Sequence, residues 1–383
     1  MEFVLYSSVG WDFLWQRPQQ MAWHMSQHHP VAYVDWPPAV LGRAVIHSNE
    51  RTAVRRALRP PAEPRPNLFR LKPFMPFGNR RYVNWRPIRA ANAASVRSCV
   101  RRACRRLGFE HPILWAYFSL PLLDCCVDGL PLLYEAVDDL RLFASPWMPA
   151  DELVRRERAI VTRATWVTAT ARHLCDRVES VYGVACHYLP NGCDYDHFRQ
   201  ALRPLPAPDD LEPIPRPRVG YVGAVAYWLN LDLIAEVAAL RPEMSFVFVG
   251  PVIGDKVEER LAGIPNVHLL GEKHYADLPR YLAHFDVCTI PFKLDEFMRS
   301  VNPIKFYEYL AANRPVVAAP LPELLPHAAV ARFAEDPSDF AEAIDASLAE
   351  PRDARSVARQ RVAQANTWDA RCQRLLDILG GNA

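Results

Sequence analysis

Asn302–Pro320 reads NPIKFYEYLAANRPVVAAP, and this stretch decides the fold. Asn302 suits the N-cap of a helix, and Pro303 suits the first helical position, because the missing N–H of proline costs nothing there. Asn313 is expected to end the helix, and the VVAA that follows to form a short buried strand. With a strand predicted in DVCTIPF from Asp286, the unit reads β-loop-α-β. This order places the helix N-terminus at the carboxyl edge of a parallel sheet.

The N-terminus of this predicted helix has the features of an anion site. Its first amides have no partner within the helix, and the helix dipole favours negative charge there. Lys305 and Glu308 are three residues apart, so both side chains project from one face. The apolar stripe on the opposing face is expected to hold Ile304, Tyr307, Leu310 and Ala311. The pattern indicates a nucleotide-sugar site; the alternative is an exposed Lys–Glu pair on an ordinary α/β helix.

The same segment resembles the donor-site helix of retaining glycosyltransferases of family 4, which have the GT-B fold. That family carries two glutamates eight positions apart, the second followed by a small-residue helix end and PVV. Glu308 with YLAANRPVV matches the second glutamate, which in the family holds the ribose hydroxyls. The first would fall at Ser300, so this half of the motif is missing. Family subgroups with PxKxYEYLA are the nearest match.

Other segments resemble the same family in the right order. They are LPNGCDYDHF from Leu189, RVGYVGA from Arg218, NVHLLG ending at Gly271, LPRYL from Leu278 and DVCTIP from Asp286. The family usually has an arginine and a lysine after the VGx loop, whereas residues 224–231 contain no basic residue. The phosphate charge must then be met by Lys305, Arg299, Lys293 or backbone amides.

The resemblance implies which residues form the site. Donor-binding residues are expected at Gly10, Gly223, Gly271, Lys273, Arg299, Ser300, Asn302, Pro303, Ile304, Lys305 and Glu308. Acceptor-side residues are expected at Arg17, Asp138 and Asp139, and catalytic roles at Asp138, Lys305 and Glu308. No cofactor is expected, because a UDP-sugar or GDP-sugar enters as a substrate.

Two of the acceptor-side motifs leave alternatives open. In WQRPQ from Trp15, Arg17 either faces the cleft or pairs with an acid while Trp15 packs in the core. In VDDL, Asp139 matches a family residue, whereas Asp138 replaces the family's histidine. The two aspartates also suggest a cation site, although the fold needs no metal, and Asp139 could simply cap a following helix.

Composition and patterning describe an ordinary globular chain of 383 residues. The first residues lack the pattern of a signal peptide, and no run approaches the roughly 18 apolar residues of a membrane span. Nine cysteines without ligand-type spacing argue for reduced thiols in the cytoplasm. A single glycine in VGWDF from Val9 argues against a dinucleotide fingerprint.

Strands and helices alternate as a doubly wound sheet requires. We expect strands at 2–8 and 31–36 and from Ile113, Leu132 and Ala164, with a helix at 16–28. Residues 203–217 contain six prolines and are expected to form the domain linker. The predicted domains are 1–200 and 218–355, and 356–383 is expected to form a helix that crosses back to the first domain.

Positive charge is concentrated between Arg43 and Arg106, where seventeen Arg and Lys meet two Glu, a local net charge of +15. Such a segment could contact anionic lipid, an acidic glycan acceptor or nucleic acid, or be a solvated face. Anionic membrane is preferred, because the family often glycosylates lipid-linked acceptors. Nucleic acid is not expected, because no recognised motif accompanies the charge.

The sequence therefore predicts an α/β protein of the GT-B type, with two Rossmann-like domains facing an interdomain cleft. The predicted function is sugar transfer from a nucleoside-diphosphate sugar to a glycan or lipid-linked acceptor, with retention implied by the resemblance. A non-hydrolysing sugar-nucleotide epimerase and a non-catalytic glycan-binding protein of the same fold are the alternatives.

Overall fold

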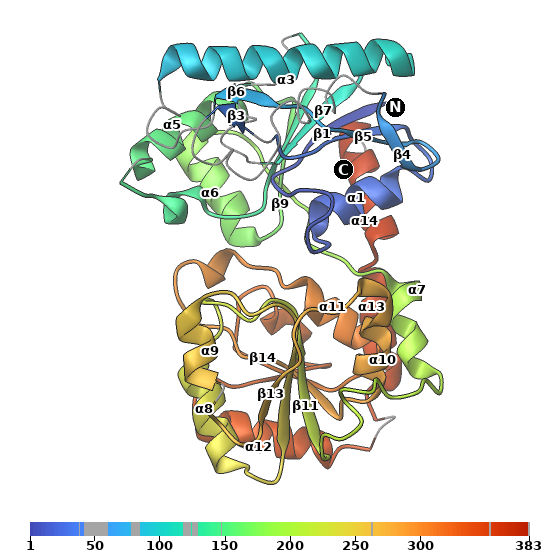
Figure 1. Cartoon of the computed structure of the whole chain (residues 1–383), viewed down its shortest axis with the longest axis vertical. Coiled ribbons are helices and arrows are strands. Elements are labelled where there is room, and N and C mark those ends of the chain that lie inside the picture. Colours follow the sequence, from blue (N-terminus) through green and yellow to red (C-terminus); the bar gives the residue numbers. More distant parts are fainter. Residues whose placement is uncertain are drawn as a thin grey trace. The chain divides into compact units, whose positions relative to one another are not determined.

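The computed structural model describes residues 1–37, 39–41, 60–77, 85–117, 124, 129–146, 148–261, 263–351 and 354–381. It forms two compact units, one of Met1–Pro190 with Arg371–Ala383 and one of Asn191–Ala370. Each unit contains a parallel β-sheet with helices packed on it (Figure 1). The predicted α/β class with two parallel-sheet units is confirmed.

The first unit is built on a sheet with the strand order β10-β9-β8-β7-β1-β2-β5-β4. Its strands are β1 (Phe3–Tyr6), β2 (Val31–Val34), β4 (Ala62–Arg65), β5 (Leu68–Leu71), β7 (Ile113–Tyr117), β8 (Leu132–Ala136), β9 (Trp166–Ala169) and β10 (His187–Tyr188). Neighbours pair in parallel except β4 with β5, and β3 (Ala39–Leu41) pairs separately with β6 (Met75–Phe77). The strands expected from the sequence of this unit are confirmed.

Helices cover both faces of this sheet (Figure 1). They are α1 (Arg17–Met25), α3 (Arg86–Leu107), α5 (Ala150–Val161) and α6 (Arg172–Tyr182), joined by the C-terminal part of α14 (Trp368–Leu379). Val96 and Val100 of α3, Val4 of β1 and Leu174 of α6 all belong to one buried apolar cluster. The helix predicted at 16–28 is confirmed, although it ends at Met25.

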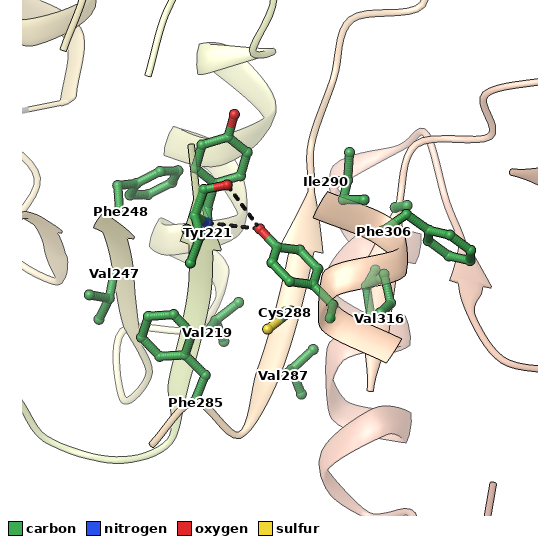
Figure 2. Packing of buried hydrophobic residues seen from close by; sticks show 14 of the residues in the cluster. Val219, Tyr221, Val247, Phe248, Phe285, Val287, Cys288, Ile290, Phe306 and Val316 are labelled. Atoms are coloured by element: carbon green, nitrogen blue, oxygen red, sulfur yellow. Dashed lines mark hydrogen bonds between the residues drawn. The ribbon is translucent and has the colours of Figure 1, made fainter. Parts of the chain in front are cut away.

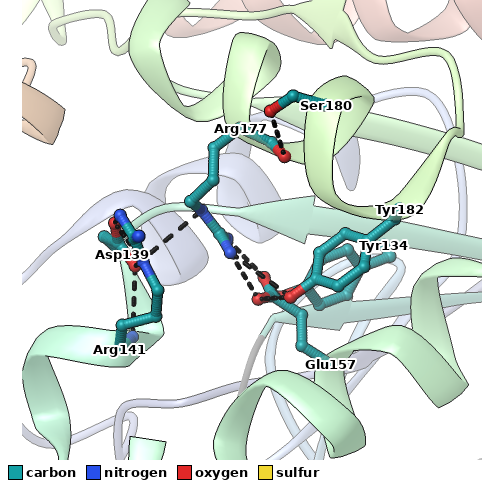
Figure 3. Close-up of polar contacts among 7 residues, drawn as sticks. All are labelled: Tyr134, Asp139, Arg141, Glu157, Arg177, Ser180 and Tyr182. Carbon is teal, nitrogen blue, oxygen red and sulfur yellow. Dashed lines mark hydrogen bonds and ion pairs between the residues drawn. The ribbon is translucent and has the colours of Figure 1, made fainter. Parts of the chain in front are cut away.

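A buried ion pair fixes α6 to α5 inside the first unit (Figure 3). Both carboxylate oxygens of Glu157 accept hydrogen bonds from Arg177, at 2.7 and 2.8 Å. The hydroxyls of Tyr134 and Tyr182 donate to the same carboxylate, at 2.8 and 2.5 Å. Because Glu157 is fully buried, these four bonds replace the hydration that the carboxylate loses on folding.

The second unit has a parallel sheet with the order β13-β12-β11-β14-β15-β16. Its strands are β11 (Arg218–Val222), β12 (Ser245–Val249), β13 (Val267–Leu269), β14 (Val287–Ile290), β15 (Val316–Ala318) and β16 (Arg332–Phe333). Its helices include α7 (Tyr195–Phe198), α8 (Leu231–Leu240), α9 (Asp255–Leu261), α10 (Leu278–Ala283), α11 (Ile304–Ala311), α12 (Pro337–Leu348) and α13 (Ser356–Ala365). The β14-loop-α11-β15 order predicted from the deciding stretch is confirmed.

The core of the second unit locks α11 onto the central strands (Figure 2). Phe306 of α11 lies in the same cluster as Val219, Phe248 and Ile290 of the sheet. The hydroxyl of Tyr309 accepts a hydrogen bond from the backbone N–H of Val222, at 2.8 Å. This bond ties the helix to the last residue of β11, next to the loop that begins at 223.

The proline-rich segment 203–217 belongs to the second unit, whose boundary at Asn191 lies ahead of the predicted linker. Leu211 and Ile214 are buried in the core of this unit. Tyr281 of α10 donates a 2.7 Å hydrogen bond to Asp210. The prolines exclude regular structure, but the apolar residues between them still pack on the sheet domain.

No helix within the described residues is long and apolar enough to cross a membrane.

Replacing Glu157 with alanine is expected to lower the free energy of unfolding by about 3–5 kcal/mol, because Arg177 would remain buried without its main partner. Asp232→Ala breaks an exposed pair with Arg260 and serves as a control, with an expected cost below about 1 kcal/mol. Urea unfolding of both variants measures the difference. Equal losses of unfolding free energy in the two variants would show that the buried Glu157–Arg177 pair stabilises the protein no more than an exposed pair does.

Candidate active site

Helix α11 begins one residue later than predicted. Pro303 is its N-cap and Ile304 its first residue, and the Pro303 carbonyl accepts a 3.1 Å bond from Phe306. Within the described chain, no backbone acceptor is recorded for the N–H groups of Ile304 and Lys305. These two N–H groups therefore lie at the helix N-terminus, at the carboxyl edge of the sheet, and can donate to a bound anion.

The prediction that Asn302 caps this helix is wrong. Its side-chain oxygen accepts a 3.2 Å bond from the backbone N–H of Asn191, and its amide nitrogen donates to Glu323 at 3.2 Å. The Asn191 side chain also donates to the Asn302 carbonyl, at 2.5 Å. Asn302 is thus a buried link between the segment at Asn191 and the start of α11, rather than a cap.

Helix α11 ends as predicted. Asn313 adopts a left-handed backbone conformation with φ of 53°. The N–H of Asn313 donates to Leu310 and the N–H of Arg314 donates to Tyr309, both at 2.9 Å. These two bonds form a Schellman motif, which satisfies the last carbonyls of the helix. The predicted apolar stripe is confirmed for Tyr307, Leu310 and Ala311, whereas Ile304 is only half-buried.

Lys305 presents its ammonium group between two aromatic rings. The Nζ lies 5.2 Å from the ring centroid of Tyr221 and 4.9 Å from that of Phe292. Such contacts hold a cation without neutralising it. No carboxylate partner of Lys305 is recorded within the described residues. Tyr221 and Phe292 were not predicted as site residues, and their only signal in the sequence is their position next to strand ends.

Glycines keep the space beside this ammonium group open. Gly223 has φ of 138°, and a Cβ built on it would lie 3.0 Å from Cε of Lys305. A Cβ on Gly250 would lie 2.1 Å from the carbonyl oxygen of Gly223. Gly223 donates to Val249 at 2.8 Å, and Gly250 donates to the carbonyl of Gly271 at 2.9 Å. The loops after β11, β12 and β13 are therefore tied together at the carboxyl edge. Gly250 was missed from the sequence.

Glu308 lies one turn after Lys305 and is buried. Burial raises the pKa of its carboxyl group to about 7, although Lys305 acts to lower it. No hydrogen bond or ion pair to this carboxylate is recorded within the described parts of the chain. A carboxylate without a protein partner is well suited to accept hydrogen bonds from ligand hydroxyls.

The other donor-side candidates differ in their surroundings. The Ser300 hydroxyl is buried and has no hydrogen-bond partner within the described residues, so a ligand oxygen could satisfy it. Arg299 is exposed. Lys273 is bound elsewhere, because its Nζ lies 2.8 Å from a carboxylate oxygen of Asp210 in the proline-rich segment. Lys273 is therefore not available as a free cation at the donor site.

In the first unit, the two aspartates after β8 have different roles. Asp139 is buried, pairs with Arg141 at 2.5 Å and caps the short 3₁₀ helix that follows. Burial alone would raise its pKa, but the hydrogen bonds from Arg141 lower it. Asp138 is half-buried, and burial together with the neighbouring Asp139 charge raises its pKa to about 6. Asp139 is thus structural, whereas Asp138 remains a candidate.

Arg17 and Gly10 take structural positions within the first unit. Arg17 is buried, forms an ion pair with Glu135 and donates to the Pro190 carbonyl at 2.9 Å. This is the alternative in which Arg17 pairs with an acid. The Gly10 carbonyl accepts a 3.1 Å bond from Gln19.

The described residues contain no group of three or more His, Cys, Asp or Glu that could hold a metal ion. The oxygens of Asp139 are occupied by Arg141, so the two aspartates do not form a paired set of free ligands. This arrangement does not support the cation site suggested by the VDDL motif.

Comparison with known proteins agrees with this arrangement. Residues 216–350 match the family described as glycosyl transferases group 1. A protein of Bacillus subtilis (strain 168) named as a teichuronic acid biosynthesis glycosyltransferase, TuaH, is 26% identical over 291 residues, which is 71% of this chain and 72% of that protein.

Solved structures share the fold over the whole chain. Sucrose-phosphate synthase from Thermosynechococcus elongatus has a TM-score of 0.73 at 16% identity, covering 99% of this chain and 98% of that one. Anabaena HepE in complex with UDP-glucose has a TM-score of 0.63 at 13% identity, covering 100% of both chains. The predicted GT-B fold is confirmed.

The match to the group 1 glycosyltransferases covers residues 216–350, and together with the relatives it identifies the protein as a nucleotide-sugar-dependent transferase. The matches favour neither the epimerase nor the non-catalytic protein that the sequence left open.

Glu308→Gln is expected to stabilise the ligand-free protein by roughly 3 kcal/mol at about pH 8. The folded pKa of about 7 lies above the ordinary value of 4.5, so ionised Glu308 opposes folding. This penalty is absent below about pH 4.5, grows as the pH rises and is complete above about pH 7. Urea unfolding of the variant and the wild type at both ends of this pH range measures the penalty. A difference in unfolding free energy that does not change with pH would contradict a raised pKa for Glu308.

Proposed function

We propose that the protein transfers a sugar from a UDP-sugar to a glycan or lipid-linked acceptor, with retention of the anomeric configuration. The observation that carries the proposal is the pair on α11, an ammonium group and a buried carboxylate one turn away, neither of which has an ion-pair partner among the described residues. The HepE structure in complex with UDP-glucose supports UDP over GDP as the nucleotide. A GDP-sugar is the alternative donor.

The diphosphate would bind at the N-terminus of α11. The Lys305 ammonium and the N–H groups of Ile304 and Lys305 would contact phosphate oxygens, and the Ser300 hydroxyl would donate to the donor. These donors are fixed before the substrate arrives, so they would stabilise the charge that develops on the departing diphosphate. The anomeric carbon becomes cationic in this step, and retention requires no protein base for the acceptor.

The Glu308 carboxylate would accept hydrogen bonds from the two ribose hydroxyls. Its burial strengthens such bonds, because little water competes for the carboxylate. Asp138, for which the described parts of the chain supply no partner, is the first-unit group that we assign to the acceptor side. With a pKa of about 6 it would be ionised at neutral pH and would accept a hydrogen bond from an acceptor hydroxyl.

We also propose that the protein contacts anionic membrane through the basic segment, peripherally and from the cytoplasmic side. The part of this segment that lies in residues 42–59 and 78–84 is outside the described residues. Its described part includes α3, which carries seven arginines and no acidic residue. Each Arg near an anionic surface contributes about 1 kcal/mol, and the contact weakens with salt.

Glu308→Ala is expected to weaken UDP binding at least tenfold, because charge-assisted hydrogen bonds are worth about 1.5–3 kcal/mol each. Isothermal titration with UDP measures the change, and a matched assay of UDP release from UDP-sugars, with and without acceptor, reports turnover. Glu236→Ala, an exposed change on α8, is the control. Unchanged UDP affinity in a folded Glu308→Ala protein would remove Glu308 from the site.

Turnover is expected to continue in EDTA, because a helix N-terminus and Lys305 meet the phosphate charge that a metal ion would otherwise neutralise. Lys305→Ala is expected to reduce turnover both with and without added Mn²⁺. Complete loss of wild-type activity in EDTA, restored by Mn²⁺, would contradict the proposal and revive the cation site at Asp138 and Asp139.

A further inference from the structure

Helix α3 carries an unusual row of charge. Arg97, Arg101 and Arg105 are spaced four residues apart, so their side chains leave one face of the helix. Like charges at this spacing repel one another, and the helix contains no acidic residue to offset them. Only Arg105 lies in the last turn, where the helix dipole favours a cation. The row therefore presents positive charge that no side chain of its own helix offsets.

A groove of about 640 Å³ runs beside this row. Its polar rim includes Arg97, Ser98, Arg101 and Arg105, and its apolar wall includes Phe109 and Leu130. Among the described residues that line it, Glu110 alone is acidic. We name it the α3 groove. Its volume is within the range of small-molecule sites, and its lining combines cations with apolar surface.

Two of these cations are available to a ligand. Arg97 donates a 2.7 Å hydrogen bond to the carbonyl of Asp124. Arg101 and Arg105 are exposed, and no hydrogen bond or ion pair to either is recorded among the described residues. Two guanidinium groups one turn apart can contact one phosphate together, because each can donate two N–H groups to its oxygens.

The α3 groove is separate from the acceptor side of the first unit. Phe109 and Leu130 precede β7 and β8, so the groove lies at the amino edge of the sheet. Asp138 follows the carboxyl end of β8. The five residues of β8 span roughly 17 Å. A ligand in the groove would therefore not compete with the acceptor for Asp138.

We infer that the α3 groove binds an anionic phospholipid, with the phosphate on Arg101 and Arg105 and the start of an acyl chain along Phe109 and Leu130. This deepens the membrane contact proposed above and rests on it, because the bilayer supplies the lipid. It does not rest on the donor site, which belongs to the other unit.

The test uses the full chain and a short-chain phosphatidylglycerol that stays monomeric in solution. A single-lipid site binds this monomer, whereas a diffuse basic face binds only vesicles of long-chain phosphatidylglycerol. The double variant Arg101→Glu/Arg105→Glu is expected to lose at least about tenfold in affinity for the monomer. Ser98→Trp, which fills the groove without changing its charge, is expected to have the same effect.

The same helix offers a matched control. Arg102 and Arg106 have the same four-residue spacing and line a smaller hollow of about 210 Å³ on the other flank. Arg102→Glu/Arg106→Glu changes the charge equally and should leave monomer affinity nearly unchanged. Equal loss in both double variants, or wild-type protein that binds vesicles but not the monomer, would overturn the groove site. Monomer binding without vesicle binding would support the groove but contradict the membrane contact. UDP affinity, measured alongside, reports on the donor site separately.

Discussion

The missing side chain at Gly223 is the constraint on which the donor site depends. A Cβ there would lie 3.0 Å from Cε of Lys305, in a backbone conformation that other residues rarely adopt. Gly250 meets a similar limit, because a Cβ on it would collide with the Gly223 carbonyl oxygen. The ends of β11 and β12 can therefore lie in close contact, and the Lys305 ammonium group keeps its position against Tyr221 and Phe292. The site is open because two side chains are absent.

The charges of the two units are arranged so that structural and functional carboxylates can be told apart. Glu135, Glu157 and Asp139 are buried, and each is paired with an arginine within its own unit. No arginine of the described segments is paired with Glu308 or Asp138, and burial raises the pKa of both. A folded chain rarely tolerates a buried carboxylate without a partner unless a ligand uses it. The lack of an arginine partner therefore separates the carboxylates of the candidate site from the structural carboxylates.

Local rules explain what the sequence could predict. Helix α11, its end at Asn313 and the strand β15 that follows depend on neighbouring residues, and all three were predicted. Long-range partners explain what it could not predict. The side chain of Asn302 does not cap α11, because its oxygen accepts a hydrogen bond from Asn191, which is 111 residues away. Arg17 forms an ion pair with Glu135. Lys273 pairs with Asp210 in a segment whose prolines suggested a linker. The spacing of residues in the sequence does not show which distant residue will be the ion-pair or hydrogen-bond partner of a side chain.

Hydrogen–deuterium exchange with saturating UDP tests the central claim most directly. The account predicts slower exchange at the N–H groups of Ile304 and Lys305, because phosphate oxygens would become their acceptors. Uridine, which has no phosphate, should leave these two amides unchanged at the same occupancy. Equal exchange with and without UDP, or equal protection by uridine, would contradict a diphosphate site at the start of α11.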